Sequence, residues 1–346
     1  MAVEPDRLTI FWEGTANTII PVTTLIGSLF VNVPAVDVST TQPPLDVGSD
    51  GPPVAWKMGF DGTGVTNGLP GTIWAFGLNE CCDRILHQSR ILLEAKRSRP
   101  LHLTIVGLSR GGCGALLFAK RCAELGKEAL SRIRLNLLVY DPVPGNLINT
   151  LRFCDLFGLT VAGSTLDVRS APIARMLAIY PHEPLPDLAF HAPVLPRCPA
   201  HCDLEVDATL GCHQGAVYPP EYVRPTGPVH DACVLSHNRL LSFLAECGVR
   251  VNDPAAPGGP GEARLRAQCL AICESALRTP APSTRAAHAY HQSGMIIRHA
   301  ATSGRRQLLN KHHRKLLEHL TPEDPRLKSP KEAGDELPLL LEVWQP

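Results

Sequence analysis

Ser109 is the residue whose surroundings most clearly suggest chemistry, because it lies in the pentapeptide Gly107-Leu108-Ser109-Arg110-Gly111. The apolar run 101–106 before it predicts a buried strand, and 113–125 carries apolar residues at helical spacing. A serine on a sharp turn between strand and helix can serve as a nucleophile, and its flanking glycines are needed because a Cβ would collide in the strained turn. The same pattern also fits a glycine-rich turn that only packs a helix on a strand.

A serine hydroxyl becomes a nucleophile when a histidine accepts its proton and a carboxylate orients that histidine. Asp141 follows the apolar run Ile133 to Tyr140, and His213 lies in a glycine-flanked loop after a later strand. We therefore predict Ser109, Asp141 and His213 as nucleophile, acid and base. The residues that stay open as alternatives are Asp155, Asp167 and Asp187 for the acid, and His230 and His237 for the base.

Acyl transfer also needs backbone N–H groups that bind the developing oxyanion. One is expected from Arg110, directly after the serine, and the second from an earlier strand-to-helix loop. We favour Gly14-Thr15 as that loop, and Gly62-Thr63-Gly64 is the alternative.

Strands and helices alternate along the part of the chain that must position these residues. Continuous apolar runs predict buried strands at 8–12, 54–60, 101–106, 133–140 and 175–180, and helical patterns cover 18–31, 72–96, 113–125 and 231–247. Residues 204–210 alternate between apolar and polar, which predicts an edge strand. The expected fold is α/β, with a doubly wound, mainly parallel sheet.

A stretch of Pro, Gly and Ala at 255–261 predicts a linker, which divides the chain into a catalytic domain at 1–252 and an extension at 253–346. Helical patterns at about 262–277 and 285–320 predict that the extension is helical. Between Ala281 and Leu320, seven Lys or Arg residues accompany a single Glu. Such a basic helix could contact anionic lipid, or bind a partner if the chain were a catalytically inactive interaction protein.

The composition excludes several classes of function. Lys plus Arg and Asp plus Glu number 33 each, so no nucleic-acid partner is expected. The first residues have no secretory signal pattern and no apolar run reaches about 20 residues, which predicts a soluble, cytoplasmic protein unless export uses a route without a signal peptide. The 12 cysteines fit a reducing compartment.

A metal site is the main rival to the serine chemistry. Cys198, His201, Cys202, Cys212 and His213 carry the ligand types that zinc prefers, but their spacing matches no familiar zinc module. We therefore expect no metal and no cofactor.

Four ordered motifs carry a resemblance to a known family. These are Phe11-Trp12-Glu13-Gly14-Thr15-Ala16-Asn17, Gly59-Phe60-Asp61-Gly62-Thr63-Gly64, Leu108-Ser109-Arg110-Gly111-Gly112 with Asp141-Pro142-Val143, and Leu210-Gly211-Cys212-His213-Gln214-Gly215. They are similar to the motifs of the α/β-hydrolase-like family that includes the phospholipase effectors of bacterial type VI secretion. The chain departs from that pattern at Glu13, Pro142 and Gln214-Gly215, where the family has Asp, Thr and Ser-Asp.

The resemblance covers about residues 8–248. It implies an α/β-hydrolase fold and an ester hydrolase with Ser109, Asp141 and His213 as its triad, acting on phospholipids or other lipid esters. The residues themselves indicate a small-molecule or lipid ester without identifying its acyl chain or head group.

Overall fold

The sheet at the centre of the molecule has seven parallel strands in the order β2-β3-β1-β4-β5-β6-β7. The computed structural model describes residues 4–40, 52–65, 77–95, 99–144, 161, 164–165, 167–181, 194, 196–209, 218–219, 228–252, 296–299 and 306–309. The strands are β1 (Asp6–Trp12), β2 (Val36–Asp37), β3 (Ala55–Phe60), β4 (Leu101–Leu108), β5 (Ile133–Tyr140), β6 (Ile173–Pro181) and β7 (Asp203–Thr209). The prediction of a parallel α/β sheet is confirmed, and β7 lies at its edge as its alternating pattern predicts.

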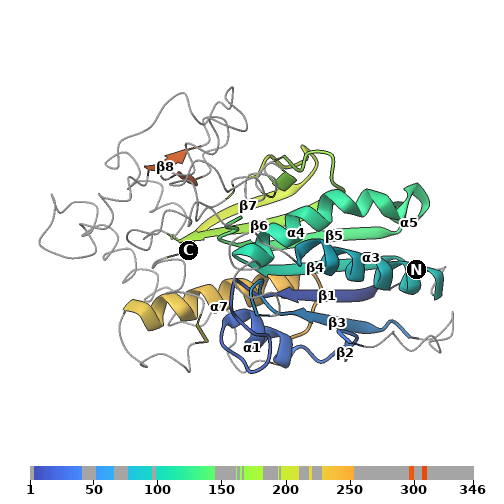
Figure 1. The fold of residues 1–346 in the computed structure, drawn as a ribbon, viewed down its shortest axis with the longest axis horizontal. Coiled ribbons are helices and arrows are strands. Elements are labelled where there is room, and N and C mark those ends of the chain that lie inside the picture. The colour runs from blue at the N-terminus through green and yellow to red at the C-terminus, as the bar shows by residue number, and fades with distance from the viewer. Residues whose placement is uncertain are drawn as a thin grey trace, which may run out of the picture.

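Helices cover both faces of this sheet (Figure 1). They are α1 (Leu25–Asn32), α3 (Leu78–Ala95), α4 (Arg110–Arg121), α5 (Lys127–Ser131) and α7 (Pro228–Glu246), with a 3-10 turn at Cys122–Leu125. Side chains of α3 and α4 share one buried apolar cluster with alternate residues of the central strands. Those of α1 and α7 share a second cluster with the residues in between. The central strands therefore read as continuous apolar runs because both of their faces are covered.

The strand order reverses between β1 and β4, which are neighbours in the sheet. From β1 the chain passes through α1 toward β2 and β3, on one side. From β4 it passes through α4 toward β5, on the other side. Because α1 and α4 lie in different apolar clusters, the loops after β1 and β4 diverge to opposite faces. In open parallel sheets, ligands bind at the carboxyl ends of the strands at such a reversal.

Two helix predictions need correction. The pattern at 18–31 predicts one helix, but the structure has turns there and α1 begins only at Leu25, after Thr24. The Thr24 side chain accepts a hydrogen bond from the N–H of Ile26 at 3.1 Å, so it caps the helix, and Pro21 cannot supply the N–H that a continuous helix needs.

The second correction falls in the C-terminal extension. The pattern at 285–320 predicts a helix, but Ile296–His299 and Arg306–Leu309 form an antiparallel pair, β8 and β9. Adjacent β-branched residues at 296 and 297 favour a strand, and Ser303-Gly304 between the two segments is a turn sequence. The predicted linker, the helix at 262–277 and the rest of the basic segment lie outside the described residues.

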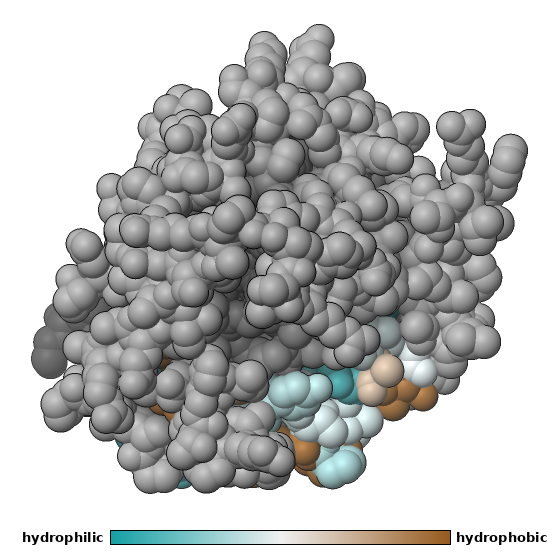
Figure 2. Space-filling model, turned by 90° about the vertical axis from the view of Figure 1, so that its left-hand side faces the viewer, coloured by the Kyte–Doolittle hydropathy of each residue, from teal (hydrophilic) through white to brown (hydrophobic). Residues whose placement is uncertain are grey.

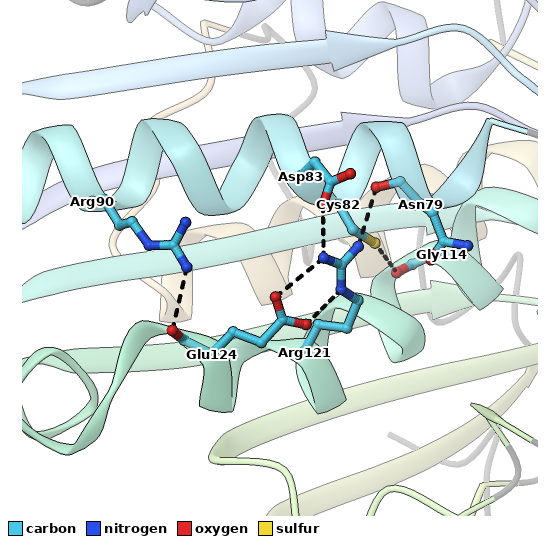
Figure 3. A network of polar contacts seen from close by, with 7 residues as sticks. All are labelled: Asn79, Cys82, Asp83, Arg90, Gly114, Arg121 and Glu124. Carbon is cyan, nitrogen blue, oxygen red and sulfur yellow. Dashed lines mark hydrogen bonds and ion pairs between the residues drawn. The ribbon is translucent and has the colours of Figure 1, made fainter.

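A polar network fixes α4 to α3 on the outer surface (Figure 3). Arg121 of α4 donates to Asp83 of α3 at 2.6 Å and to Glu124 at 2.7 Å. It also donates to the backbone carbonyl of Asn79 at 3.2 Å. Hydrogen bonds to these carboxylates raise the pKa of Arg121, so it stays charged. The network holds the C-terminal end of the helix whose other end carries Ser109.

Candidate active site

Ser109 lies on a strained turn between β4 and α4, with φ 55° and ψ −116°. Few residues other than glycine adopt a positive φ, and strain of this kind concentrates at functional sites. A Cβ at Gly107 would lie 2.4 Å from the carbonyl oxygen of Gly111, and one at Gly111 would lie 2.2 Å from that of Trp12. The predicted strand, sharp turn and helix are confirmed, and both glycines are required. We call residues 107–111 the elbow.

Asp141 stands beside Ser109 at the same edge of the sheet. The strands before them pair in register, Leu108 with Tyr140. The Ser109 N–H continues that ladder by donating to the carbonyl of Tyr140 at 2.8 Å, and the Asp141 N–H donates to Ile179 at 2.8 Å. Asp141 is buried and has a positive φ of 42°, so its backbone also turns sharply. The structure therefore places the predicted nucleophile and acid on adjacent strand ends.

The loop after β1 flanks the elbow on its other side, because Trp12 of β1 pairs with Gly107 of β4. We call residues 13–24 the β1 loop. Asp61, after β3, accepts a hydrogen bond from the N–H of Ile19 at 2.8 Å. Backbone hydrogen bonds join Ala16 to Thr63 and Gly62 to Asn17. The segment 62–64, which was the alternative oxyanion donor, thus binds the side of the β1 loop that faces away from the elbow. It follows β3, which is one strand further from the elbow than β1.

A direct hydrogen bond joins the two loops that flank the candidate site. The buried Arg110 guanidinium donates to the hydroxyl of Thr15. Arg110 follows the nucleophile and Thr15 belongs to the favoured oxyanion loop, so this contact connects both predicted oxyanion donors. The pentapeptide pattern indicates a role for the Arg110 backbone only, and its side-chain contact could not be predicted from spacing.

Glu13 is a buried carboxyl that the sequence pattern did not assign to the site. It follows β1 directly, and its Oε1 accepts a hydrogen bond of 2.7 Å from the Thr24 hydroxyl. Burial raises its pKa to about 7, against the opposing effects of Thr24 and of the Gly14 and Gly27 backbone amides. Its Oε2 accepts no hydrogen bond from any residue that the structure describes. The signal available in the sequence was a carboxylate placed directly after the apolar residues Ile10 to Trp12 that end β1.

The candidate bases are only partly described. His213 lies outside the described residues, as do Asp155 and Asp187. His230 belongs to α7, and His237, further along that helix, is buried. Its neighbour Ser236 has a hydroxyl 3.5 Å from that of Tyr140, the residue before Asp141. His237 therefore stays a structural alternative to His213.

Asp167 is less suited to be the acid of a triad. Its carboxylate is engaged by the Arg169 guanidinium through hydrogen bonds of 2.6 to 3.1 Å. These bonds lower the pKa of Asp167 and hold it in an exposed ion pair.

The metal hypothesis concerns a segment that is only partly described. Cys198 and Cys202 are half-buried thiols there, whereas Cys212 and His213 lie outside the described residues. Within the described ranges, no three His, Cys, Asp or Glu residues are grouped so that they could hold a metal ion.

In the coloured part of Figure 2, hydrophobic (brown) and hydrophilic (teal) residues lie side by side. Large exposed apolar residues such as Ile20 and Val31 occur among the described residues, and single ones are ordinary on protein surfaces. None of the described helices combines the length and the apolar character that crossing a bilayer requires.

Comparisons with known proteins are weak. No protein-family model matches the chain, and no curated protein matches it. An uncharacterised protein from Pseudomonas aeruginosa aligns with 81% of this chain at 13% identity and a TM-score of 0.44, and the chain spans 52% of that protein. The peroxisomal α/β-hydrolase Lpx1 from Saccharomyces cerevisiae aligns with 82% of this chain and 88% of its own at 13% identity and a TM-score of 0.34. Similarities of this size identify neither a family nor an activity.

Proposed function

We propose that this chain is a serine hydrolase that cleaves carboxylic esters through an acyl-enzyme. The observation that carries the proposal is the glycine-locked elbow, which holds Ser109 at a positive φ beside the reversal of strand order. A turn that only packed a helix on a strand would not need a serine in so strained a conformation. Asp141 on the adjacent strand end supports the same reaction.

In the proposed reaction, Ser109 Oγ attacks the ester carbonyl carbon while His213 takes the hydroxyl proton. The negative charge that forms on the carbonyl oxygen is bound by the backbone N–H groups of Arg110 and the β1 loop. The intermediate expels the alcohol, which receives the proton from His213. Water then attacks the acyl-enzyme with the same histidine as base, and the carboxylate product leaves. Asp141 orients His213 and stabilises its charged form.

Within the β1 loop, the N–H groups of Gly14 and Thr15 are the two candidates for the second donor. The N–H groups of Glu13, Ala16 and Asn17 donate to backbone carbonyls. Those of Gly14 and Thr15 donate to no backbone carbonyl among the described residues. Both are therefore available to a substrate oxyanion.

A lipid ester is the substrate class that we propose, and its support is the resemblance of the four ordered motifs to those of the secreted phospholipase effectors. The acyl-chain length that the enzyme prefers is to be measured directly.

The test is hydrolysis of p-nitrophenyl esters from acetate to palmitate by the full chain. Ser109→Ala should abolish turnover, whereas Ser131→Ala, at an exposed serine on α5, should match the wild type. A preference for long acyl chains supports the lipid ester. His213→Ala and His237→Ala, compared at the same pH, identify the base. Equal activity of Ser109→Ala and wild type would overturn the proposal.

A further inference from the structure

We propose that Arg7, His102 and Arg134, which lie in register on three neighbouring strands near the amino end of the sheet, form a binding site for a phosphate group. We call these three residues the cationic row. Arg7 pairs with His102 in the ladder of β1 and β4, and His102 pairs with Arg134 in that of β4 and β5. Ser109 follows the opposite end of β4, about 20 Å away along the strand, so this site is separate from the candidate active site.

The three side chains of the cationic row project from the same face of the sheet. The residues that follow them along each strand pack in the apolar cluster with α3 and α4; they are Leu8, Leu103 and Leu135. Because successive side chains of a strand alternate between faces, the cationic row points to the face that α1 and α7 cover. Neighbouring strands lie about 4.8 Å apart, so both guanidinium groups can reach one anion placed over His102.

The C-terminal end of α7 lies against the cationic row. The chain leaves α7 through Gly248, which has a positive φ of 75°, and the Val249 N–H donates to the Leu244 carbonyl at 2.8 Å. A Cβ at Gly248 would lie 3.1 Å from Nε of Arg7, so the guanidinium and this backbone are in contact. A helix C-terminus carries about half a negative charge, which offsets only part of the charge of two arginines.

Within the described part of the chain, no carboxylate forms an ion pair with any member of the cationic row. The acidic residues on β7 and at the end of α7 bind Arg175 instead; they are Asp203, Glu205 and Glu246. Asp6 precedes Arg7 but points to the other face, where it accepts from the Val54 N–H at 2.9 Å. Like charges side by side on neighbouring strands are destabilising, so we expect an anion to be held between them.

The next residues on the same face are polar as well, although they are buried. They are Thr9, Thr104 and Asn136, one on each of the three strands. Asn136 is 1% exposed, and its Nδ2 donates to the Thr104 hydroxyl at 3.4 Å. Its Oδ1 accepts no hydrogen bond from any described residue. A partly protonated phosphate, or a water bound beside it, can supply the missing donor, whereas an apolar ligand cannot.

Phosphate is the anion that the two arginines favour. A guanidinium binds phosphate oxygens through paired N–H groups, and a doubly charged anion balances two arginines. Burial lowers the pKa of His102, and the charges of Arg134 and Arg7 lower it further. A bound dianion would oppose the effect of both charges, so phosphate should raise the pKa of His102.

The test is a titration of the full chain with inorganic phosphate at constant ionic strength, followed by NMR of labelled histidine. The His102 resonance, assigned by its loss in His102→Gln, should shift, and its pKa should rise. Phosphate should also raise the unfolding midpoint above that in chloride, because binding stabilises the folded state. A wild-type protein that responds to phosphate no more than to chloride would overturn the inference.

Arg134→Gln is the variant that tests the cationic row with the least risk to folding, because Arg134 is exposed. The loss of its charged hydrogen bonds should raise the Kd for phosphate about tenfold. Arg90→Gln is the matched control, because Arg90 is an exposed arginine on α3, over the other face of the sheet. It should bind phosphate as the wild type does. Equal affinity of Arg134→Gln and wild type, or equal weakening by both variants, would refute the site.

Two further arms distinguish the source of the phosphate group. If it belongs to a lipid headgroup, the full chain should sediment with phosphatidylcholine vesicles that contain phosphatidic acid, but not with phosphatidylcholine alone, and Arg134→Gln should not sediment. If it belongs to a small molecule, glycerol 3-phosphate should bind as inorganic phosphate does, without sedimentation. Either result supports the site. Because the site does not depend on the proposed hydrolase, Ser109→Ala should bind phosphate as the wild type does.

Discussion

The elbow and the β1 loop follow neighbouring strands and flank the same site, yet they are held by different forces. The elbow is fixed by contacts of backbone on backbone that exclude even one methyl group at Gly107 and Gly111. The β1 loop is held by polar side chains, with Glu13 bound to Thr24 and Asp61 bound to Ile19. Arg110 connects the two through Thr15.

Because of this difference, the conformation of the elbow should be independent of pH and salt, whereas that of the β1 loop should respond to them. Steric exclusion does not depend on pH or salt, so the nucleophile keeps its conformation under all conditions in which the protein is folded. Polar contacts to a carboxyl with a pKa of about 7 depend on its charge. Substitutions in the elbow should therefore disrupt the geometry of the site, and those in the β1 loop should change its activity only in part.

The largest effect is expected at the elbow. Gly111→Ala places a Cβ 2.2 Å from the Trp12 carbonyl, a contact that only a backbone shift can relieve, and it should lower the free energy of unfolding by about 3 kcal/mol. Denaturant unfolding measures the loss. Gly112→Ala is the control, because its Cβ would meet Pro142 Cβ at 3.1 Å and needs a smaller adjustment. Equal stability of the two variants would show that the elbow is not sterically locked.

The next effect is a pH dependence of stability. The Glu13 pKa is about 7 in the folded protein and 4.5 as an ordinary glutamate, so the folded state keeps a proton that the unfolded chain releases. Stability therefore falls as pH rises from about 4.5 to 7, by about 3 kcal/mol for this group. Glu13→Gln should lack this decline. Unfolding midpoints of both proteins at pH 5 and 8 measure it, and a difference between them that stayed constant with pH would contradict the assignment.

A smaller effect is expected where the two loops are joined. Arg110→Met keeps the length of the side chain but removes the bond to Thr15, and kcat should fall about tenfold, less than the 100-fold or more for a lost oxyanion donor. Thr15→Val removes the same bond from the other side. The double variant should lose little more than either single one. Additive losses would mean that the two residues act independently.

The smallest effect is expected far from the site, at the α3–α4 network of Figure 3. Arg121→Met breaks the bonds to Asp83 and Glu124, whose side chains are 63% and 47% exposed. Solvent screens such pairs, so stability should fall by about 1 kcal/mol or less, and less still at high salt. Ester turnover should not change. A large loss of kcat would show that helix α4 transmits strain to Ser109.

The sequence predicted the strands of this fold better than its loops. Periodicity identified β5 with its bounds, because a strand covered on both faces reads as an unbroken apolar run. It failed at residues 18–24, where apolar residues at helical spacing lie in turns that polar contacts hold. It also failed at 296–299 and 306–309, where local β-propensity outweighed the helical pattern.

The candidate site was predictable where its chemistry depends on backbone geometry. Gly107, Ser109 and Gly111 stand close together in sequence, and the steric reason for their spacing is local. The contacts of Glu13 with Thr24 and of Arg110 with Thr15 join residues 11 and 95 positions apart, and only the fold brings them together. His213 stays a prediction, because it lies outside the described residues.

The most direct test of the central claim is labelling of the folded chain with a fluorophosphonate probe, which reacts with activated serines, followed by mass spectrometry of the modified peptide. The proposed hydrolase predicts one modified residue, Ser109, with labelling lost in Ser109→Ala and strongly reduced when the catalytic histidine is replaced. A folded wild-type protein that takes up no label at Ser109 would contradict the account.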